Sequence, residues 1–299
     1  MKLYYHKGAN FGDAINPMIF EKILGVQFDE DEEVGIVGIG SILGHFRPTE
    51  KTKRFYVFSS GFAGGDASTY GTPPEIKSPY EIICVRGKST AKALGIDESY
   101  AVADGALLLP RLIDIPAPNL EHDYGYMPHV GSLDLYDDWK SVVESVGIHF
   151  IDPTKDPISV LTEMKKCKVI MTEAMHGAII CDAIRIPWIP IVSNKNINAF
   201  KWKDYLETVN LTYAPHHIPT LYSRDKLLEI TARKVKFKPL SSIATSILLS
   251  RQSGTIKKVK NTFLSLKSQK TYLCDEQTLS SLQDQLLEKG IKLRKSLLG

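Results

Sequence analysis

The chain has 299 residues, which is long for one ordinary domain and suits two. Its composition, 43% hydrophobic and 24% charged, is that of a folded globular protein and excludes a wholly disordered chain. The sequence contains no apolar run of about 18 residues and no apolar segment at its start, so we expect a cytoplasmic protein that does not span a membrane. Its four cysteines are widely scattered without a CxxC pair, which predicts buried, reduced thiols rather than disulfides or a zinc site.

The net charge of +3 conceals an uneven distribution of charge along the chain. From Arg233 to the end there are 14 basic and 4 acidic residues, whereas the preceding part holds 23 basic and 30 acidic residues. A basic tail on an acidic body attracts anionic lipid, nucleic acid or a lipid-linked phosphate, or is simply a solvated helical appendage. We expect peripheral contact with the inner face of a membrane through this tail, and no nucleic-acid partner.

Apolar segments alternate with helical segments in the first third of the chain. We expect strands at residues 2–5, 34–41, 54–61 and 80–87, and helices at residues 14–24 and 89–94. Gly95 directly follows the second helix and suits a helix C-cap. This alternation predicts right-handed βαβ units and a parallel sheet.

A proline-rich segment, Pro110–Pro118, resembles an interdomain linker. The alternation then resumes. We expect strands at residues 124–127, 148–151, 168–171 and 188–192, and helices at residues 138–145, 158–166 and 178–184.

From about Asp225 the strands stop and the sequence becomes helical. We expect helices at residues 225–235, 239–251, 256–266, 277–287 and 291–298. Residues 256–266 combine apolar residues at helical spacing with three lysines. Such a helix can lie on an anionic membrane or pack its apolar side on the protein, and the sequence leaves both possibilities open.

These elements predict an α/β fold with two Rossmann-like domains, each built on a parallel sheet, in a GT-B-like arrangement with a C-terminal helical tail. We place the N-terminal α/β domain at residues 1–115, the C-terminal α/β domain at 116–224 and the basic helical tail at 225–299. Ligands of such folds bind beyond the carboxyl ends of the strands, so we expect the site in the cleft between the two sheets.

Polar side chains occur repeatedly just after predicted strands. Taken singly, a histidine in such a place is more often a structural hydrogen-bonding group, and an arginine an ion-pair partner. Their shared location at strand ends in both halves makes them candidates for one cleft. They are Asn10, Asp13, Ser41, Arg86, Asp104, His129, Glu173, His176 and Lys195. The sequence has no GxGxxG, Walker A or HExxH motif, so we expect neither a metal nor a cofactor.

Several short motifs, in this order, resemble bacterial polysaccharide pyruvyl transferases, and most of all the exopolysaccharide members of the succinoglycan type. The resemblance covers roughly residues 1–205 and leaves out the tail. The motifs lie at residues 10–13 (NFGD), 38–43 (GIGSIL), 57–61 (VFSSG), 85–95 (VRGKSTAKALG), 104–109 (DGALLL), 172–178 (TEAMHGA) and 185–188 (RIPW).

The resemblance implies which residues form the site. Arg86 and His176 match the arginine and histidine that the family uses for phosphoenolpyruvate and turnover, and Lys195 approximately matches a basic residue that follows the histidine. It leaves Asn10, Asp13, Ser41, Asp104, His129 and Glu173 as acceptor or cleft residues. The chain departs from the common pattern at Ala174, where many members carry arginine.

The implied reaction is transfer of pyruvate from phosphoenolpyruvate to a sugar, or to a lipid-linked oligosaccharide, as a ketal. The donor carries a phosphate and a carboxylate, so its site needs fixed cations, and a histidine suits the proton transfers near neutral pH. A GT-B glycosyltransferase that uses a nucleotide sugar is the alternative enzyme. A non-catalytic member that binds a glycan precursor is the third hypothesis.

Overall fold

A computed structural model of the chain describes residues 1–64, 70–116, 118–234 and 238–298. The first sheet lies in the N-terminal third and has four parallel strands in the order β1-β2-β3-β4. These strands are β1 (Lys2–Tyr4), β2 (Val34–Val37), β3 (Arg54–Ser60) and β4 (Tyr80–Val85). The helices around it are α1 (Phe11–Ala14), α2 (Asn16–Leu24), α4 (Lys88–Leu94) and α5 (Leu109–Leu112), with 3-10 turns η1 (Glu98–Tyr100) and η2 (Gly105–Leu108).

The second sheet is also parallel and has five strands in the order β6-β5-β7-β8-β9. They are β5 (His122–Met127), β6 (His149–Phe150), β7 (Cys167–Thr172), β8 (Trp188–Val192) and β9 (His216–His217). Its helices are α6 (Val130–Leu133), α7 (Trp139–Glu144), α8 (Pro157–Lys165), α9 (Met175–Ala183) and α10 (Ala199–Leu206). The expected GT-B-like pair of Rossmann-like parallel sheets is confirmed, while β9 and α10 are elements that the sequence analysis does not predict.

One hydrophobic core joins the two halves. It contains Phe20 and Phe58 from the first half and Ile180 and Tyr205 from the second, all fully buried. Because these side chains pack in one continuous cluster, the loops at the carboxyl ends of the two sheets are held against each other. All four cysteines are buried free thiols, as expected.

The C-terminal segment forms fewer and longer helices than the sequence predicts: α11 (Arg224–Lys234), α12 (Lys238–Leu266) and α13 (Glu276–Leu298). The helices expected from the sequence leave a gap at residues 252–255 and another at 288–290. Both gaps are wrong, because Gly254 lies inside α12 and Gly290 lies inside α13. A glycine inside a helix costs only about 1 kcal/mol, which tertiary packing easily offsets. At Gly290 the packing requires a glycine, because a Cβ there would lie 2.6 Å from the side chain of Ile23 in α2.

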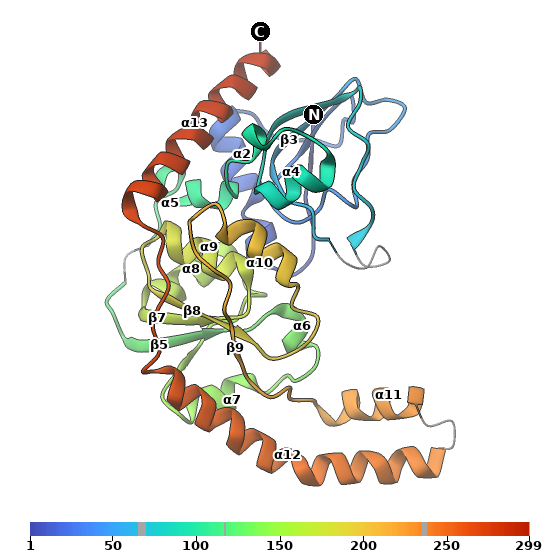
Figure 1. Cartoon of the computed structure of the whole chain (residues 1–299), viewed down its shortest axis with the longest axis vertical. Helices are drawn as coiled ribbons and strands as arrows, with labels where there is room; N and C mark the ends of the chain where they lie inside the picture. The colour runs from blue at the N-terminus through green and yellow to red at the C-terminus, as the bar shows by residue number, and fades with distance from the viewer. Residues whose placement is uncertain (65–69, 117, 235–237, 299) are drawn as a thin grey trace.

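The two long helices pack on different halves of the molecule. Val259, Phe263 and Leu266 of α12 are buried beside the second sheet. Helix α13 instead returns to the first half and runs beside α2 and α5 (Figure 1). There the Gln283 amide donates a 2.7 Å hydrogen bond to the carbonyl of Leu107.

The proposed boundaries at residues 115 and 224 stay a prediction. The two sheets lie on either side of residue 115. Pro110, the first residue of the expected linker, belongs to α5. Within the described ranges, no helix is both long enough and apolar enough to cross a membrane.

Candidate active site

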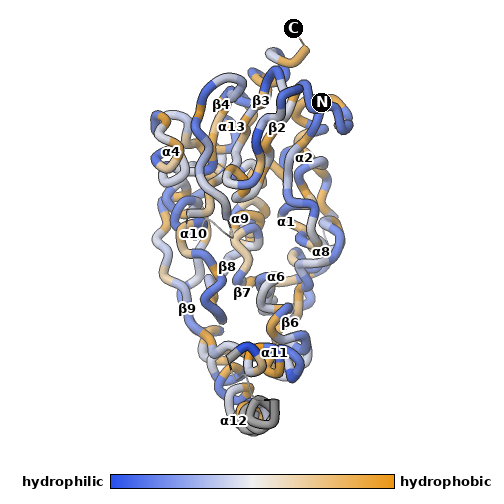
Figure 2. The backbone as a smooth tube through the Cα atoms, turned by 90° about the vertical axis from the view of Figure 1, so that its right-hand side faces the viewer, coloured by the Kyte–Doolittle hydropathy of each residue, from blue (hydrophilic) through white to orange (hydrophobic). Residues whose placement is uncertain are grey.

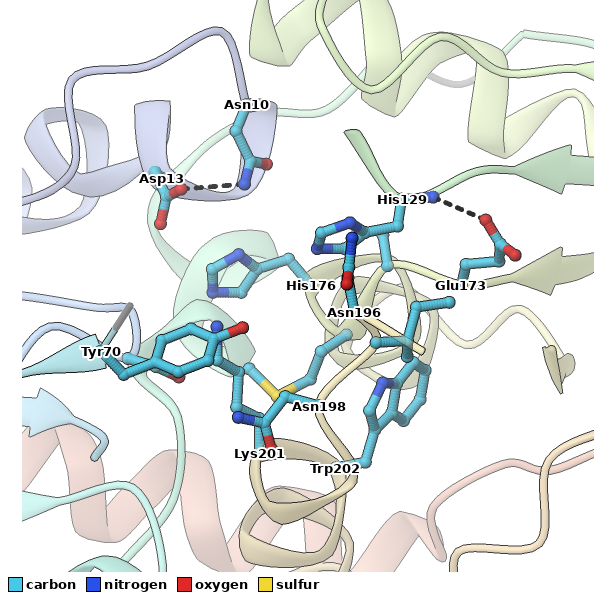
Figure 3. Close-up of a pocket in the computed structure, with 14 residues that line it drawn as sticks. Asn10, Asp13, Tyr70, His129, Glu173, His176, Asn196, Asn198, Lys201 and Trp202 are labelled. Carbon is cyan, nitrogen blue, oxygen red and sulfur yellow. Dashed lines mark hydrogen bonds between the residues drawn. The ribbon is translucent and has the colours of Figure 1, made fainter. Parts of the chain in front are cut away.

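A pocket of about 90 Å³ lies where the carboxyl ends of the two sheets meet (Figure 3). Its lining combines the loop after β1, the loop after β2, the β5–α6 loop, the start of α9 and the start of α10. The lining residues are Asn10, Asp13, Ser41, Tyr70, His129, Glu173, Ala174, Met175, His176, Asn196, Ile197, Asn198, Lys201 and Trp202. Six residues predicted for the cleft are therefore brought together: Asn10, Asp13, Ser41, His129, Glu173 and His176.

The first half contributes a carboxyl group at the N-terminus of α1. Asn10 caps this helix by accepting a 3.1 Å hydrogen bond from the backbone of Gly12, and its Nδ2 donates to Asp13 Oδ2 at 2.8 Å. Burial raises the pKa of Asp13 to about 6, against the opposing effects of His6, Lys201 and this hydrogen bond. Asp13 can therefore exchange a proton close to neutral pH.

His176 enters the pocket from the first turn of α9, directly after β7. Its Nε2 is buried and has no hydrogen-bond partner among the described residues. Burial, together with the positive charges of Arg86 and Lys201, lowers the pKa of His176 to about 3. The imidazole is consequently neutral, and a bound anion would raise its pKa.

The backbone of α1 packs directly on the ring of His176. A Cβ added at Gly12 would lie 2.1 Å from His176 Nδ1, so no side chain fits between them. This close approach brings the carboxyl group of the first half and the imidazole of the second half to one space (Figure 3). Gly12 is therefore required for the geometry of the site.

A second histidine and a buried carboxylate line the opposite wall. The backbone N–H of His129 donates to Glu173 Oε2 at 3.1 Å (Figure 3). His129 Nδ1 accepts a hydrogen bond from the backbone of Gly131 at 3.0 Å. Burial lowers the pKa of His129 to about 4 and raises that of Glu173. Glu173 Oε1 has no hydrogen-bond partner in the described part of the chain. His129 serves as the N-cap of α6, so its Nδ1 is occupied by the hydrogen bond from Gly131.

Among the described residues that line the pocket, the cation is Lys201, whereas the predicted Lys195 lies outside the lining. Asn194 accepts a 2.9 Å hydrogen bond from the backbone of Asn196, and this tight turn leaves Lys195 exposed and outside the lining. Lys201 lies on the first turn of α10, with its Nζ 4.4 Å from the ring centre of Tyr70. Burial and the charge of Arg86 lower the pKa of Lys201 to about 8, while Asp13 opposes that shift.

Arg86 lies behind the pocket in a fully buried ion pair. Its Nε donates to Asp204 of α10 at 2.8 Å, its Nη1 to Ser41 Oγ at 2.7 Å and its Nη2 to the carbonyl of Phe62 at 3.1 Å. Arg86 is thus absent from the lining. Of its three hydrogen-bond partners, Ser41 is the one that lines the pocket. Its charge still reaches the site, because it lowers the pKa of both His176 and Lys201.

Asp204 also ties the two halves together. Its carboxylate accepts hydrogen bonds from the backbone of Thr90 at 2.8 Å and from Thr90 Oγ1 at 2.6 Å. The N-cap of α4, Gly87, offers no side chain of its own, so Asp204, 114 positions after Thr90, supplies the capping group. This arrangement positions α10, and with it Lys201, against the first sheet.

Asp104 is the other predicted residue that the pocket does not include. It is fully buried and caps η2 by accepting a 3.0 Å hydrogen bond from Ala106. Burial raises its pKa to about 6, while Arg86 opposes that shift. Asp104 thus belongs to the polar layer beneath the pocket.

Tyr70 and Met175 line the pocket without having been predicted as site residues. Helix α10 and the turn before it supply five more lining residues that the sequence analysis misses: Asn196, Ile197, Asn198, Lys201 and Trp202. A helix signal is nonetheless present. Asn198 is a favourable N-cap residue, and Trp202, Tyr205 and Leu206 follow at helical spacing. The structure confirms the cap, since Asn198 Oδ1 accepts a 2.9 Å hydrogen bond from the backbone of Phe200.

Comparison with known proteins identifies the group to which this fold and site belong. Residues 35–196 match the family model described as polysaccharide pyruvyl transferase. The succinoglycan biosynthesis protein ExoV of Rhizobium meliloti (strain 1021) is 30% identical over 223 residues, which are 73% of this chain and 68% of that protein. The chain belongs to the polysaccharide pyruvyl transferase family. This family member is accordingly a transferase.

The residues that match the family model run from β2 to the turn before α10. Lys201 lies just beyond them. A crystal structure of a functionally uncharacterised protein from Klebsiella pneumoniae subsp. pneumoniae NTUH-K2044 is similar to this family member with 14% identity and a TM-score of 0.39, over 67% of this chain and 86% of that one. In the described ranges, no group of three or more His, Cys, Asp or Glu residues is placed to hold a metal ion.

Proposed function

We propose that this transferase moves pyruvate from phosphoenolpyruvate to two hydroxyls of one sugar in an exopolysaccharide precursor, forming a ketal, in the cytoplasm. The observation that carries the proposal is the unpartnered, neutral imidazole of His176 in a pocket that also holds Lys201 and Asp13. Family membership and the similarity to a succinoglycan biosynthesis protein support the same reaction.

The charges in and behind the pocket suit an anionic donor. Lys201 offers an ammonium group at the surface of the pocket, and the buried charge of Arg86 acts from behind Ser41. A donor with one phosphate and one carboxylate is attracted by both cations, and the low exposure of the site strengthens that attraction. Ala174 stands where many family members carry arginine, and Lys201 is the cation among the lining residues that the structure describes.

The reaction needs two groups that can exchange protons. The methylene carbon of the donor takes up one proton and the departing phosphate takes up another, while the two sugar hydroxyls release one proton each. The C=C π bond breaks as the methylene carbon is protonated and the first C–O bond of the ketal forms at C2. The second C–O bond forms as the bond from C2 to the phosphate oxygen breaks. His176 and Asp13 face the same space, and a bound trianion raises the pKa of both toward neutrality.

The direct test is to incubate the protein with phosphoenolpyruvate and a panel of lipid-linked saccharides and to analyse the products by mass spectrometry. We expect a saccharide that gains a pyruvate ketal, with release of one phosphate per ketal. Phosphoenolpyruvate should also raise the melting temperature, because it binds the folded state selectively. Stabilisation by nucleotide sugars and none by phosphoenolpyruvate would instead support a glycosyltransferase.

Lys201 should contribute to donor binding through its charge. Lys201→Met should weaken phosphoenolpyruvate binding about 10- to 100-fold, the usual contribution of a charge-assisted hydrogen bond. Lys195→Met is the matched control and should leave the dissociation constant unchanged, because Lys195 is exposed and outside the pocket. Isothermal titration calorimetry measures both. Equal effects of the two substitutions would contradict the assignment.

The pH dependence of binding checks the same assignment. The bound anion favours protonated Lys201, so affinity should fall as the pH rises through the pKa of about 8. Lys201→Arg stays protonated in this range and should remove the decline. A decline that persists in this variant would belong to another group.

A further inference from the structure

We propose that the outer face of α12 is a docking surface for an anionic lipid bilayer. This outer face consists of Lys257, Lys258, Lys260, Asn261 and Leu264. The proposal does not depend on the reaction assigned above, because it concerns a surface on the far side of the second sheet from α9 and α10 (Figures 1 and 2).

The position of α12 suits contact with a plane. The helix has 29 residues, and is therefore about 44 Å long at 1.5 Å per residue. It forms the lower end of the molecule in Figure 1, and Figure 2 shows it nearly end-on at the same end. A long helix at one end of the molecule can touch a flat surface along its length without interference from the rest of the protein.

The inner side of α12 is already occupied by the protein. The ring of Phe263 contacts the ring of Tyr126 edge-on at 4.9 Å between centroids, and Val259 and Leu266 are buried in the same cluster. At the end of the helix, the Lys267 ammonium donates to the carbonyl of Val146 at 2.8 Å. The apolar stripe therefore packs on the protein, and it is the opposite, outer face that points away from the body.

The charge of this outer face matches an anionic surface. Residues 238–266 contain five basic residues and no acidic residue. Lys257 and Lys258 are exposed, and neither takes part in any ion pair found among the described residues. By contrast, the chain before Arg233 carries seven more acidic than basic residues. An anionic surface thus attracts α12 and repels much of the body, which orients the molecule.

The composition of the outer face favours a bilayer over a nucleic acid. Leu264 lies seven residues after Lys257, on the same side of the helix, and is 48% exposed. An exposed leucine among lysines suits the boundary between lipid headgroups and acyl chains. The outer face has no aromatic or arginine side chain that would stack on bases.

Vesicle binding tests the proposal with a matched pair of variants. The test variant is Lys257→Glu with Lys258→Glu. The control is Lys292→Glu with Lys295→Glu, which makes the same charge change at exposed positions of α13, near the other end of the molecule. We expect the wild-type protein and the control to bind phosphatidylglycerol vesicles at low salt, and the test variant to bind at least about 25-fold more weakly. Binding of the wild type should fall as salt is added.

A fluorescent probe gives a second readout. The four native thiols are buried, so Leu264→Cys can be labelled selectively with an environment-sensitive dye, and Ile291→Cys on α13 serves as the control. Anionic vesicles should shift the emission of the label at position 264 to the blue and leave the label at 291 unchanged. Equal binding by both charge variants, equal shifts at both labels, or binding to a DNA duplex without binding to vesicles would each overturn the proposal.

Discussion

His176→Ala should lower turnover by about 10²- to 10⁴-fold, the usual contribution of a general acid or base. The same substitution should leave the free energy of unfolding nearly unchanged. The buried Nε2 of His176 has no partner to lose, so alanine removes an unsatisfied polar group together with some packing. Single-turnover kinetics with phosphoenolpyruvate measures the first quantity, and urea denaturation measures the second.

His129→Ala is the matched control for this substitution. Both histidines line the pocket and both have lowered pKa values. His129, however, caps α6 by accepting the hydrogen bond of Gly131. His129→Ala should therefore lower the free energy of unfolding by about 1 kcal/mol and should lower turnover less than His176→Ala does. A His176→Ala protein that unfolds more easily yet turns over normally would show that His176 only holds the turn between β7 and α9.

Asp204→Ala should destabilise the protein by about 3–5 kcal/mol, because it leaves the guanidinium of Arg86 buried without a counter-charge. It also removes the group that caps α4. Glu207→Ala, at the C-cap of α10, is the control. Its carboxylate accepts a hydrogen bond from Ser89 of the same cap, but in an exposed position, so we expect a change of about 1 kcal/mol or less. Urea denaturation of the two variants makes the comparison.

A double variant separates the structural role of Arg86 from its electrostatic role. Arg86→Met with Asp204→Leu should recover part of the lost stability, because well-packed apolar residues often replace a buried ion pair. The donors of Thr90 remain unpaired and limit the recovery. If the field of Arg86 helps to hold the donor, phosphoenolpyruvate binding should stay weak in the recovered protein. A double variant that binds the donor normally would show that Arg86 stabilises the fold and does not contribute to donor binding.

The pattern of local sequence suffices to predict both sheets. Runs such as residues 34–41 and 54–61 are apolar on both sides, which is typical of strands covered by helices on both faces. The ends of helices near glycines are predicted less well. Gly95 ends its helix in the left-handed conformation, with φ of 66°, whereas Gly290 lies inside α13 because of its contact with Ile23. The same residue type therefore ends one helix and permits close packing in another.

The candidate site is predictable as far as it depends on strand ends. Asn10, Ser41 and His176 each follow a strand closely, and the topology alone brings them together. Lys201 and the partner of Arg86 depend instead on how α10 packs on the first half. Asp204 is 118 residues from Arg86 in sequence, and no local pattern indicates such a pairing.

The return of α13 to the first half has a consequence for the order of assembly during synthesis. Leu282, Leu286 and Leu293 of α13 complete the core that α2 and η2 begin. The part of the protein that leaves the ribosome first therefore cannot complete its own core until α13 has emerged. Until then it exposes apolar surface, a state that is prone to aggregation and that chaperones recognise. A ribosome-bound nascent chain that stops before Asp275 should accordingly remain sensitive to protease in its first half.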